Sequence, residues 1–300
     1  MFRRTLVPTD FSAPSDAALE YARLFAGVWG GALHIMHVTG DRLTPPHGSG
    51  DPGPEPAALR QIRDRLRDED RRHRLKIRVV ERAAPAEAIL GYARNAEVDL
   101  IVMGTHGRRG VAHALVGSVA EKVVRSAPCP VLTMREAPAT GTTGFKRILV
   151  ATDFSAPSDA ALDYARALAL RFGASIHLVH VFEDPPLNGP FGSEARSIRF
   201  EDARERLSHR VTAYERHKRR VTTEVLLGAV APTIVDYAAD IGFDLIVMGT
   251  HGRTGIAHVM TGSVAERVVR TAACPVLTTH AMRAGIEIPL PTTAKVALTA

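Results

Sequence analysis

The feature that most constrains this chain of 300 residues is an internal repeat. Residues 9–19 read TDFSAPSDAAL, and the same letters recur without a change at residues 152–162, 143 positions later. Residues 103–132 match residues 248–277 at 22 of 30 positions, with an offset of 145. Self-similarity of this kind means that the chain holds two copies of one fold, each of about 140 residues, which is an ordinary size for a domain.

The repeat also predicts the domain boundaries. We expect the first domain at residues 1–136, a linker at 137–144, the second domain at 145–279 and a tail at 280–300. The linker follows from the sequence EAPATGTTG at 136–144, because its Pro, Ala, Thr and Gly content cannot sustain an apolar period.

Short apolar runs alternate with helix-length segments in each copy. Residues 14–29 are predicted to form a helix, with Ser12 as its N-cap. Strands that are apolar throughout and separated by helices are typical of a parallel sheet covered on both faces. Each copy is therefore expected to be a doubly wound α/β domain with a five-stranded parallel sheet flanked by helices. In the first copy the predicted strands are residues 5–9, 33–38, 77–80, 100–103 and 131–134.

The composition favours an ordinary packed protein, with 45% hydrophobic and 23% charged residues. No run approaches the roughly 18 consecutive apolar residues of a membrane span, and the first ten residues lack a signal-peptide core. Cys129 and Cys274 cannot make a disulfide framework and are expected to be small buried thiols. We therefore expect a cytoplasmic protein without a membrane segment.

The net charge of +6 raises the question of nucleic-acid binding. The densest basic run, residues 60–78, has four acidic residues between its arginines. That interleaving favours a solvated helix with i,i+4 ion pairs over a phosphate-binding patch, so we expect no nucleic-acid partner.

Candidate ligand-binding residues follow the predicted strands, because open parallel sheets bind ligands beyond the carboxyl ends of their strands. Asp10 and Asp153 come after the first strand of each copy, where a carboxylate either accepts hydrogen bonds from a ligand or caps the turn into the helix. After the fourth strand the first copy reads Gly104-Thr-His-Gly107, nine residues, then Gly117-Ser118. The second copy repeats this spacing as Gly249-Thr-His-Gly252, nine residues, then Gly262-Ser263.

These glycines favour phosphate binding. Without a Cβ, backbone N–H groups can approach phosphate oxygens, and a helix N-terminus attracts an anion. The pattern is neither a dinucleotide fingerprint nor a Walker A loop, because no G-x-G-x-x-G follows the first strand and no Gly-Lys-Ser/Thr occurs.

The pattern resembles the universal stress protein family in its ATP-binding subgroup, whose signature is Gly, two residues, Gly, nine residues, Gly-Ser/Thr. The resemblance covers nearly all of each copy: the PTDFS opening, His37-Val38 and His180-Val181 at the end of the second strand, the MGTHG loop and the closing CPVL. It implies the strand order 3-2-1-4-5 in each copy, ATP as the ligand and Mg²⁺ bridging the phosphates.

The resemblance also assigns roles to residues. Asp10 and Asp153 would contact the adenosine end, the backbone of Val38 and Val181 would bind the adenine edge, and Gly104 and Gly249 would lie near ribose. Ala151 replaces Pro8 in the second copy, so the two affinities need not be equal. The residues that would hold the phosphates are Gly107, Gly117, Ser118 and Val119 in the first copy, and Gly252, Gly262, Ser263 and Val264 in the second.

Histidines near these motifs are weaker candidates. His106 and His251 are expected to be structural loop residues rather than general acids, and no residue is assigned a catalytic role. Four histidines alternate along the second strands, His34, His37, His177 and His180; without carboxylate partners they favour core or edge positions over a metal site.

The sequence therefore favours a protein that binds ATP in each half and acts in stress adaptation through nucleotide-dependent conformation and protein partners that it does not identify. The alternatives are a slow ATPase or a nucleotidyl or phosphoryl transferase, and a nucleotide-free dimerisation scaffold. We also expect the halves to form an internal pseudo-dimer through residues 131–134 and 276–279, paired antiparallel, with a homodimer as a further possibility.

Overall fold

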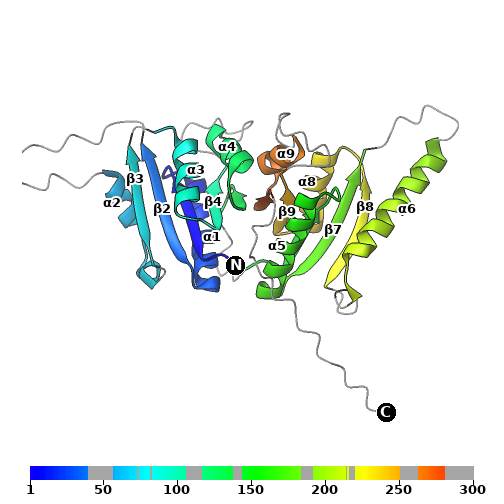
Figure 1. Ribbon diagram of the computed structural model, residues 1–300, viewed down its shortest axis with the longest axis horizontal. Coiled ribbons are helices and arrows are strands. Elements are labelled where there is room, and N and C mark those ends of the chain that lie inside the picture. The colour runs from blue at the N-terminus through cyan, green and yellow to red at the C-terminus, as the bar shows by residue number, and fades with distance from the viewer. Residues whose placement is uncertain are drawn as a thin grey trace, which may run out of the picture.

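The computed structural model describes most of the chain, and Figure 1 shows its two halves side by side. The described residues are 1–39, 57–72, 74–81, 83–105, 117–137, 144–183, 192–213, 215, 220–250 and 263–280.

The elements of the first half alternate between strand and helix as the sequence predicts. All five predicted strands are confirmed, with ends that differ by at most one residue. The elements are β1 (Arg4–Thr9), α1 (Ala13–Trp29), β2 (Ala32–Thr39), α2 (Ala57–Asp64), the 3₁₀ helix η1 (Asp68–Arg72), β3 (Lys76–Glu81), α3 (Pro85–Asn95), β4 (Leu100–Gly104), α4 (Ser118–Ser126) and β5 (Val131–Met134).

The second half repeats this series. Its long helix α6 lies at the outer side of the sheet, in the place that the shorter α2 takes in the first half (Figure 1). The elements are β6 (Arg147–Ala151), α5 (Ala156–Phe172), β7 (Ser175–Phe182), α6 (Gly192–Arg210), β8 (Val221–Leu227), α8 (Val230–Ile241), β9 (Leu245–Gly249), α9 (Ser263–Thr271) and β10 (Val276–Thr279).

The strands form one continuous sheet in the order β3-β2-β1-β4-β5-β10-β9-β6-β7-β8. Within each half the strands are parallel and follow the predicted order 3-2-1-4-5, so the doubly wound α/β fold is confirmed. The two predicted five-stranded sheets are joined into ten strands, because β5 pairs with β10 antiparallel, with Leu132 opposite Leu277. The pseudo-dimer through the last strands is therefore confirmed.

Helices cover both faces of this sheet and bury a core on each. One core contains side chains from α1, α2, α5 and α6, and the other contains side chains from α3, α4, α8 and α9. The central strands β4, β5, β9 and β10 are almost wholly buried, which explains why their sequences are mainly apolar without alternation.

An aromatic cluster joins the halves on the α1 and α5 face. Phe2 stacks on Tyr164 at 6.1 Å between ring centroids, and the equivalent pair, Phe145 and Tyr21, stacks at 6.0 Å. Both pairs are buried and their rings are nearly parallel, at 7°. The same two residues thus meet twice across a pseudo-twofold axis, as in a symmetric dimer interface.

The basic run at residues 60–78 corrects one prediction. The helix in this run ends at Asp64 instead of continuing, and η1 follows. Two of its arginines pair with α1: Arg65 Nε lies 2.6 Å from Asp16 Oδ1, and Arg67 Nη2 lies 2.8 Å from Glu20 Oε1. These ion pairs connect two elements rather than neighbouring turns of one helix.

Candidate functional site

The turn after β1 is held by its own side chains. Asp10 Oδ1 accepts hydrogen bonds from the Ser12 amide at 3.1 Å and from the Ser12 hydroxyl at 2.6 Å. Thr9 Oγ1 accepts from the amide of Phe11 at 3.0 Å and lies 3.1 Å from Ser15 Oγ. Asp10 therefore has the capping geometry that the sequence left open, and the same bonds fix its carboxylate at the carboxyl end of β1.

The helix that follows this turn begins as predicted. Ser12 occupies the N-cap of α1, Pro14 lies in the first turn, and Gly30 closes the helix in a left-handed conformation with φ 61°. The turn and the first residues of α1 follow the carboxyl end of β1, which pairs with β4, and the winding of the sheet reverses between these two strands.

Gly104, at the end of β4, has a packing reason to be glycine. A Cβ at Gly104 would lie 2.6 Å from the Cβ of Pro14 and 2.8 Å from its carbonyl carbon. The close approach of β4 to α1 therefore excludes a side chain there, whether or not ribose lies nearby.

Gly117 is different, because a Cβ there would meet only the Thr105 carbonyl oxygen, at 3.4 Å. The Gly117 amide donates to that oxygen at 2.8 Å, which ties the start of α4 to the end of β4. Ser118 and Val119 form the first turn of α4, whose N-terminal N–H groups have no partner within the helix.

The second half builds the same turn from the same residue types. Asp153 Oδ1 accepts from the Ser155 amide at 3.1 Å and from the Ser155 hydroxyl at 2.5 Å. Gly249 packs against Pro157, and a Cβ at Gly249 would lie 3.0 Å from the Pro157 Cβ. Ser263 begins α9 and Val264 follows it.

Several predicted residues fall outside the described part of the chain. They are Gly107, Gly252 and Gly262, the loop histidines His106 and His251, residues 138–143 of the predicted linker and residues 281–300 of the predicted tail.

Two histidines connect the ends of neighbouring strands. His37 Nδ1 donates to the Thr9 carbonyl at 2.7 Å, and His180 Nδ1 donates to the Thr152 carbonyl at 2.8 Å. Val38 and Val181 come directly after these histidines, at the carboxyl ends of β2 and β7. The strand ends that carry Asp10 and Val38 are therefore bonded to each other.

The other two histidines lie away from this edge. His34 is buried, its Nδ1 lies 3.0 Å from the Tyr92 hydroxyl, and burial lowers its pKa to about 4, helped by Lys76 and Arg4. The core position predicted for His34 is thus correct. His177 has a carboxylate neighbour that the sequence did not suggest, because its Nε2 lies 3.4 Å from Glu224 Oε2.

The burial predicted for the cysteines is confirmed for Cys129 and holds in part for Cys274. Cys129 is buried, and burial raises the pKa of the half-buried Cys274 to about 11. In the described part of the chain, no group of three or more His, Cys, Asp or Glu side chains is placed to hold a metal ion.

The sequence did not single out Phe11 and Phe154. Both have a left-handed backbone, with φ 65° and 66°. Arg65 contacts the Phe11 ring, and Arg206 and Arg210 contact the Phe154 ring. The available signal was the identical repeat TDFSAPSDAAL, which includes both phenylalanines, and the recurrence of the arginine at an offset of 145.

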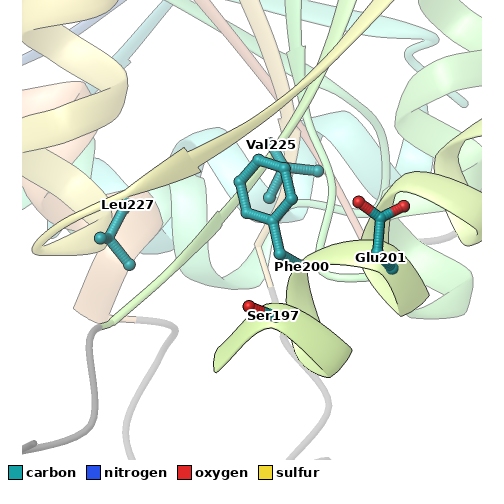
Figure 2. A pocket seen from close by; sticks show the side chains of 5 residues that line it. All are labelled: Ser197, Phe200, Glu201, Val225 and Leu227. Carbon is teal, nitrogen blue, oxygen red and sulfur yellow. The ribbon is translucent and has the colours of Figure 1, made fainter. Parts of the chain in front are cut away.

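A cavity of about 330 Å³ lies elsewhere, between α6 and β8. Figure 2 shows Phe200 pointing from α6 towards Val225 on the strand. The cavity lies two strands away from β6 and has no counterpart among the sequence motifs.

The fold defines a class: tandem doubly wound α/β domains, in each of which the winding of the sheet reverses between the first and fourth strands. The universal stress protein family model matches residues 1–135 and 144–280. The chain belongs to the universal stress protein family.

Individual relatives agree with this assignment. A universal stress protein of Methanocaldococcus jannaschii is 36% identical over 138 residues, which is 44% of this chain and 81% of that protein. One from Mycolicibacterium smegmatis is 25% identical over 290 residues, covering 91% of this chain and 95% of the relative. The crystal structure of a universal stress protein from Archaeoglobus fulgidus has a TM-score of 0.62 at 23% identity, covers 92% of this chain and 98% of its own, and supports the fold.

Among the described residues, none of the helices combines the length and the apolar character that crossing a membrane requires.

Proposed function

We propose that each half binds one ATP in the crevice at the carboxyl ends of its strands, and that the protein acts in stress adaptation through nucleotide-dependent conformation and partner binding. One observation carries this proposal. In both halves an Asp turn, a His-Val strand end and a Gly-Thr strand end lie at one edge of the sheet, and a helix beginning with Ser-Val follows the Gly-Thr end along the chain.

The described residues suit the phosphates of a nucleotide. The first turns of α4 and α9 supply backbone N–H donors and the positive end of a helix dipole. Gly117 leaves room beside these donors, since a Cβ there meets only one atom, at the edge of ordinary contact. A side chain at this position would fit the fold and yet stand between the amides and an anion.

The adenosine end is assigned to the ends of β1 and β2. The bonds from Ser12 orient the Asp10 carboxylate, which would accept from a ribose hydroxyl, and the backbone of Val38 would bind the edge of the base. Mg²⁺ would be held through the phosphates, whose charge it neutralises, since the described residues offer no metal cage.

The test is calorimetric titration of the full chain with ATP and Mg²⁺, together with native mass spectrometry. We expect close to two ATP per chain. Gly117→Val should remove the first site only and Gly262→Val the second site only, because a branched Cβ blocks the approach of phosphate to the backbone.

Gly91→Ala is the matched control, because a Cβ at Gly91 on α3 has nothing within 4 Å. It should bind ATP like the unchanged chain. Loss of all binding by either valine variant in a folded chain would mean that the sites are shared. A chain that binds no nucleotide would favour the dimerisation scaffold.

A further inference from the structure

We propose that Phe11, held between Arg65 and His37, is a positioning residue for the base end of the nucleotide site, and that Phe154 has the same role with Arg210 and His180. This inference rests on the proposed function, because it concerns how the same site discriminates between bases. It assigns a task to residues that lie beside the ligand-contacting positions rather than to those positions themselves.

The first observation is the packing of the ring. Phe11 stacks on His37 with 4.5 Å between ring centroids and 28° between planes. The guanidinium carbon of Arg65 lies 5.1 Å from the centroid of the same ring. The Phe11 ring is buried between an imidazole and a cation. An aliphatic side chain at this position could make neither the ring stack nor the cation–π contact.

The second observation is the backbone of Phe11. Its φ of 65° lies in the left-handed region, where a residue with a Cβ costs about 1 kcal/mol or more. The Phe11 amide donates to Thr9 Oγ1 at 3.0 Å, and the Phe11 carbonyl accepts from Arg65 Nη2 at 3.4 Å. Amide, carbonyl and ring are all held, so the turn is fixed in a conformation that the residue alone would avoid.

The third observation is what this turn connects. Asp10 precedes Phe11 on the β1 side, and Val38 follows His37 on the β2 side. The Phe11–His37 stack and the hydrogen bond from His37 to Thr9 therefore set the distance between the carboxylate and the backbone proposed to bind adenosine. Loosening the ring should weaken recognition of the base more than recognition of the phosphates.

The second half repeats the arrangement with equivalent residues. Phe154 has φ 66° and lies 4.4 Å from the His180 ring. Arg210 lies 4.8 Å from the Phe154 centroid, and its Nε is 2.6 Å from Asp159 Oδ1, just as Arg65 is paired with Asp16. Arg65 directly follows α2 and Arg210 is the last residue of α6, and these two helices differ in length and in most residues. Each ring nevertheless has a guanidinium over it, and Phe154 has a second one, Arg206, at 4.1 Å from its centroid.

The experiment measures ATP and GTP affinity by calorimetry for the unchanged chain, Phe11→Leu and Arg65→Gln. We expect one of the two sites to lose about tenfold in ATP affinity while GTP affinity changes less, so that the ATP preference of that site narrows. Phe154→Leu should do the same to the other site. Arg60→Gln, which removes an exposed charge from α2, should change the affinity for neither ATP nor GTP.

Circular dichroism and thermal unfolding accompany each titration, and Arg65→Gln covers the case in which the leucine variant fails to fold. Two results overturn the inference alone: unchanged ATP affinity and selectivity in the folded variants, or equal losses for ATP and GTP. An unchanged chain that binds no nucleotide overturns the proposed function together with the inference.

Discussion

The two halves hold their first helix in place with equivalent ion pairs that differ in burial. In the first, Arg23 makes a two-bonded ion pair with Asp70, with both N···O distances 2.7 Å, and the Asp70 side chain is 0% exposed. In the second, Arg166 pairs with Glu215 at 2.7 and 3.2 Å, and the side chains are 19% and 14% exposed. Both arginines tie the first helix of their half to the segment before the third strand.

The same contrast recurs at the second strand. His34 is buried near Lys76 and Arg4, whereas His177 has Glu224 beside it. Both pKa values are lowered by burial, but Glu224 opposes the shift of His177. The first half thus relies on fully buried polar groups and the second on partly solvated ones, which should make the first half more sensitive to substitution and to acid.

The largest effect should come from Asp70→Ala. It leaves the Arg23 charge buried without its main partner, which costs about 3–5 kcal/mol of unfolding free energy. Glu215→Ala should cost less, about 1–3 kcal/mol, because water can reach Arg166. Urea unfolding followed by the fluorescence of Trp29, the single tryptophan, measures both. Equal losses would remove the difference in burial as the explanation.

A smaller effect is expected at the glycines that end β4 and β9. Gly104→Ala brings a Cβ to 2.6 Å from Pro14, whereas in Gly249→Ala the nearest atoms of Pro157 lie at 3.0 Å. We expect Gly104→Ala to cost about 1–3 kcal/mol and Gly249→Ala less. Thermal unfolding of the two variants compares them, and a larger loss in Gly249→Ala would contradict the packing argument.

Acid should then destabilise the chain through His34. Its pKa falls from 6.5 in the unfolded chain to about 4 when folded, so the unfolded state binds the extra proton and stability drops as the pH falls from about 6.5 towards 4. His34→Gln should reduce the change in melting temperature between pH 7 and pH 5 more than His177→Gln does. A steeper pH dependence after His34→Gln would show that other groups carry it.

The smallest effect concerns the two proposed sites. Pro8 in β1 restricts the backbone two residues before Asp10, and Ala151 does not do so for Asp153. We expect the first site to bind ATP about two- to fivefold more tightly, from the 0.4–1 kcal/mol typical of such proline effects. Calorimetry of Pro8→Ala should bring the two affinities together, and a growing difference would contradict this account.

Much of the fold was predictable because it depends on short patterns. Apolar runs at 5–9 and 100–103 identified buried parallel strands, and Ser12, Pro14 and Gly30 are local signals that begin and end α1. The arginine run misled the prediction because charge spacing alone does not show where a helix stops. Arg65 and Arg67 are held by acidic residues on α1, far away in the sequence.

The site divides in the same way. The sequence proposed Asp10, Gly104 and Gly117 as candidate site residues from their position after strands and from their spacing. It could not show why each position is glycine in both copies. A side chain at Gly104 would collide with Pro14, while Gly117 has room for a Cβ. The left-handed Phe11 was hidden as well, because its clamp comes from residues 26 and 54 positions away, His37 and Arg65.

The sequence by itself determined that the chain contains two copies of one α/β domain, because repeats and apolar runs are local in the chain. It also predicted which segments would form the proposed nucleotide site, because glycine spacings are local as well. Tertiary structure alone decided how the copies join and which contacts fix the turn after the first strand of each copy. The stacking of Phe2 on Tyr164, the burial of Asp70 and the clamp on Phe11 all depend on contacts between distant segments. Packing and desolvation set these contacts. Neither can be inferred from the sequence alone, because both depend on segments that only the folded sheet brings together.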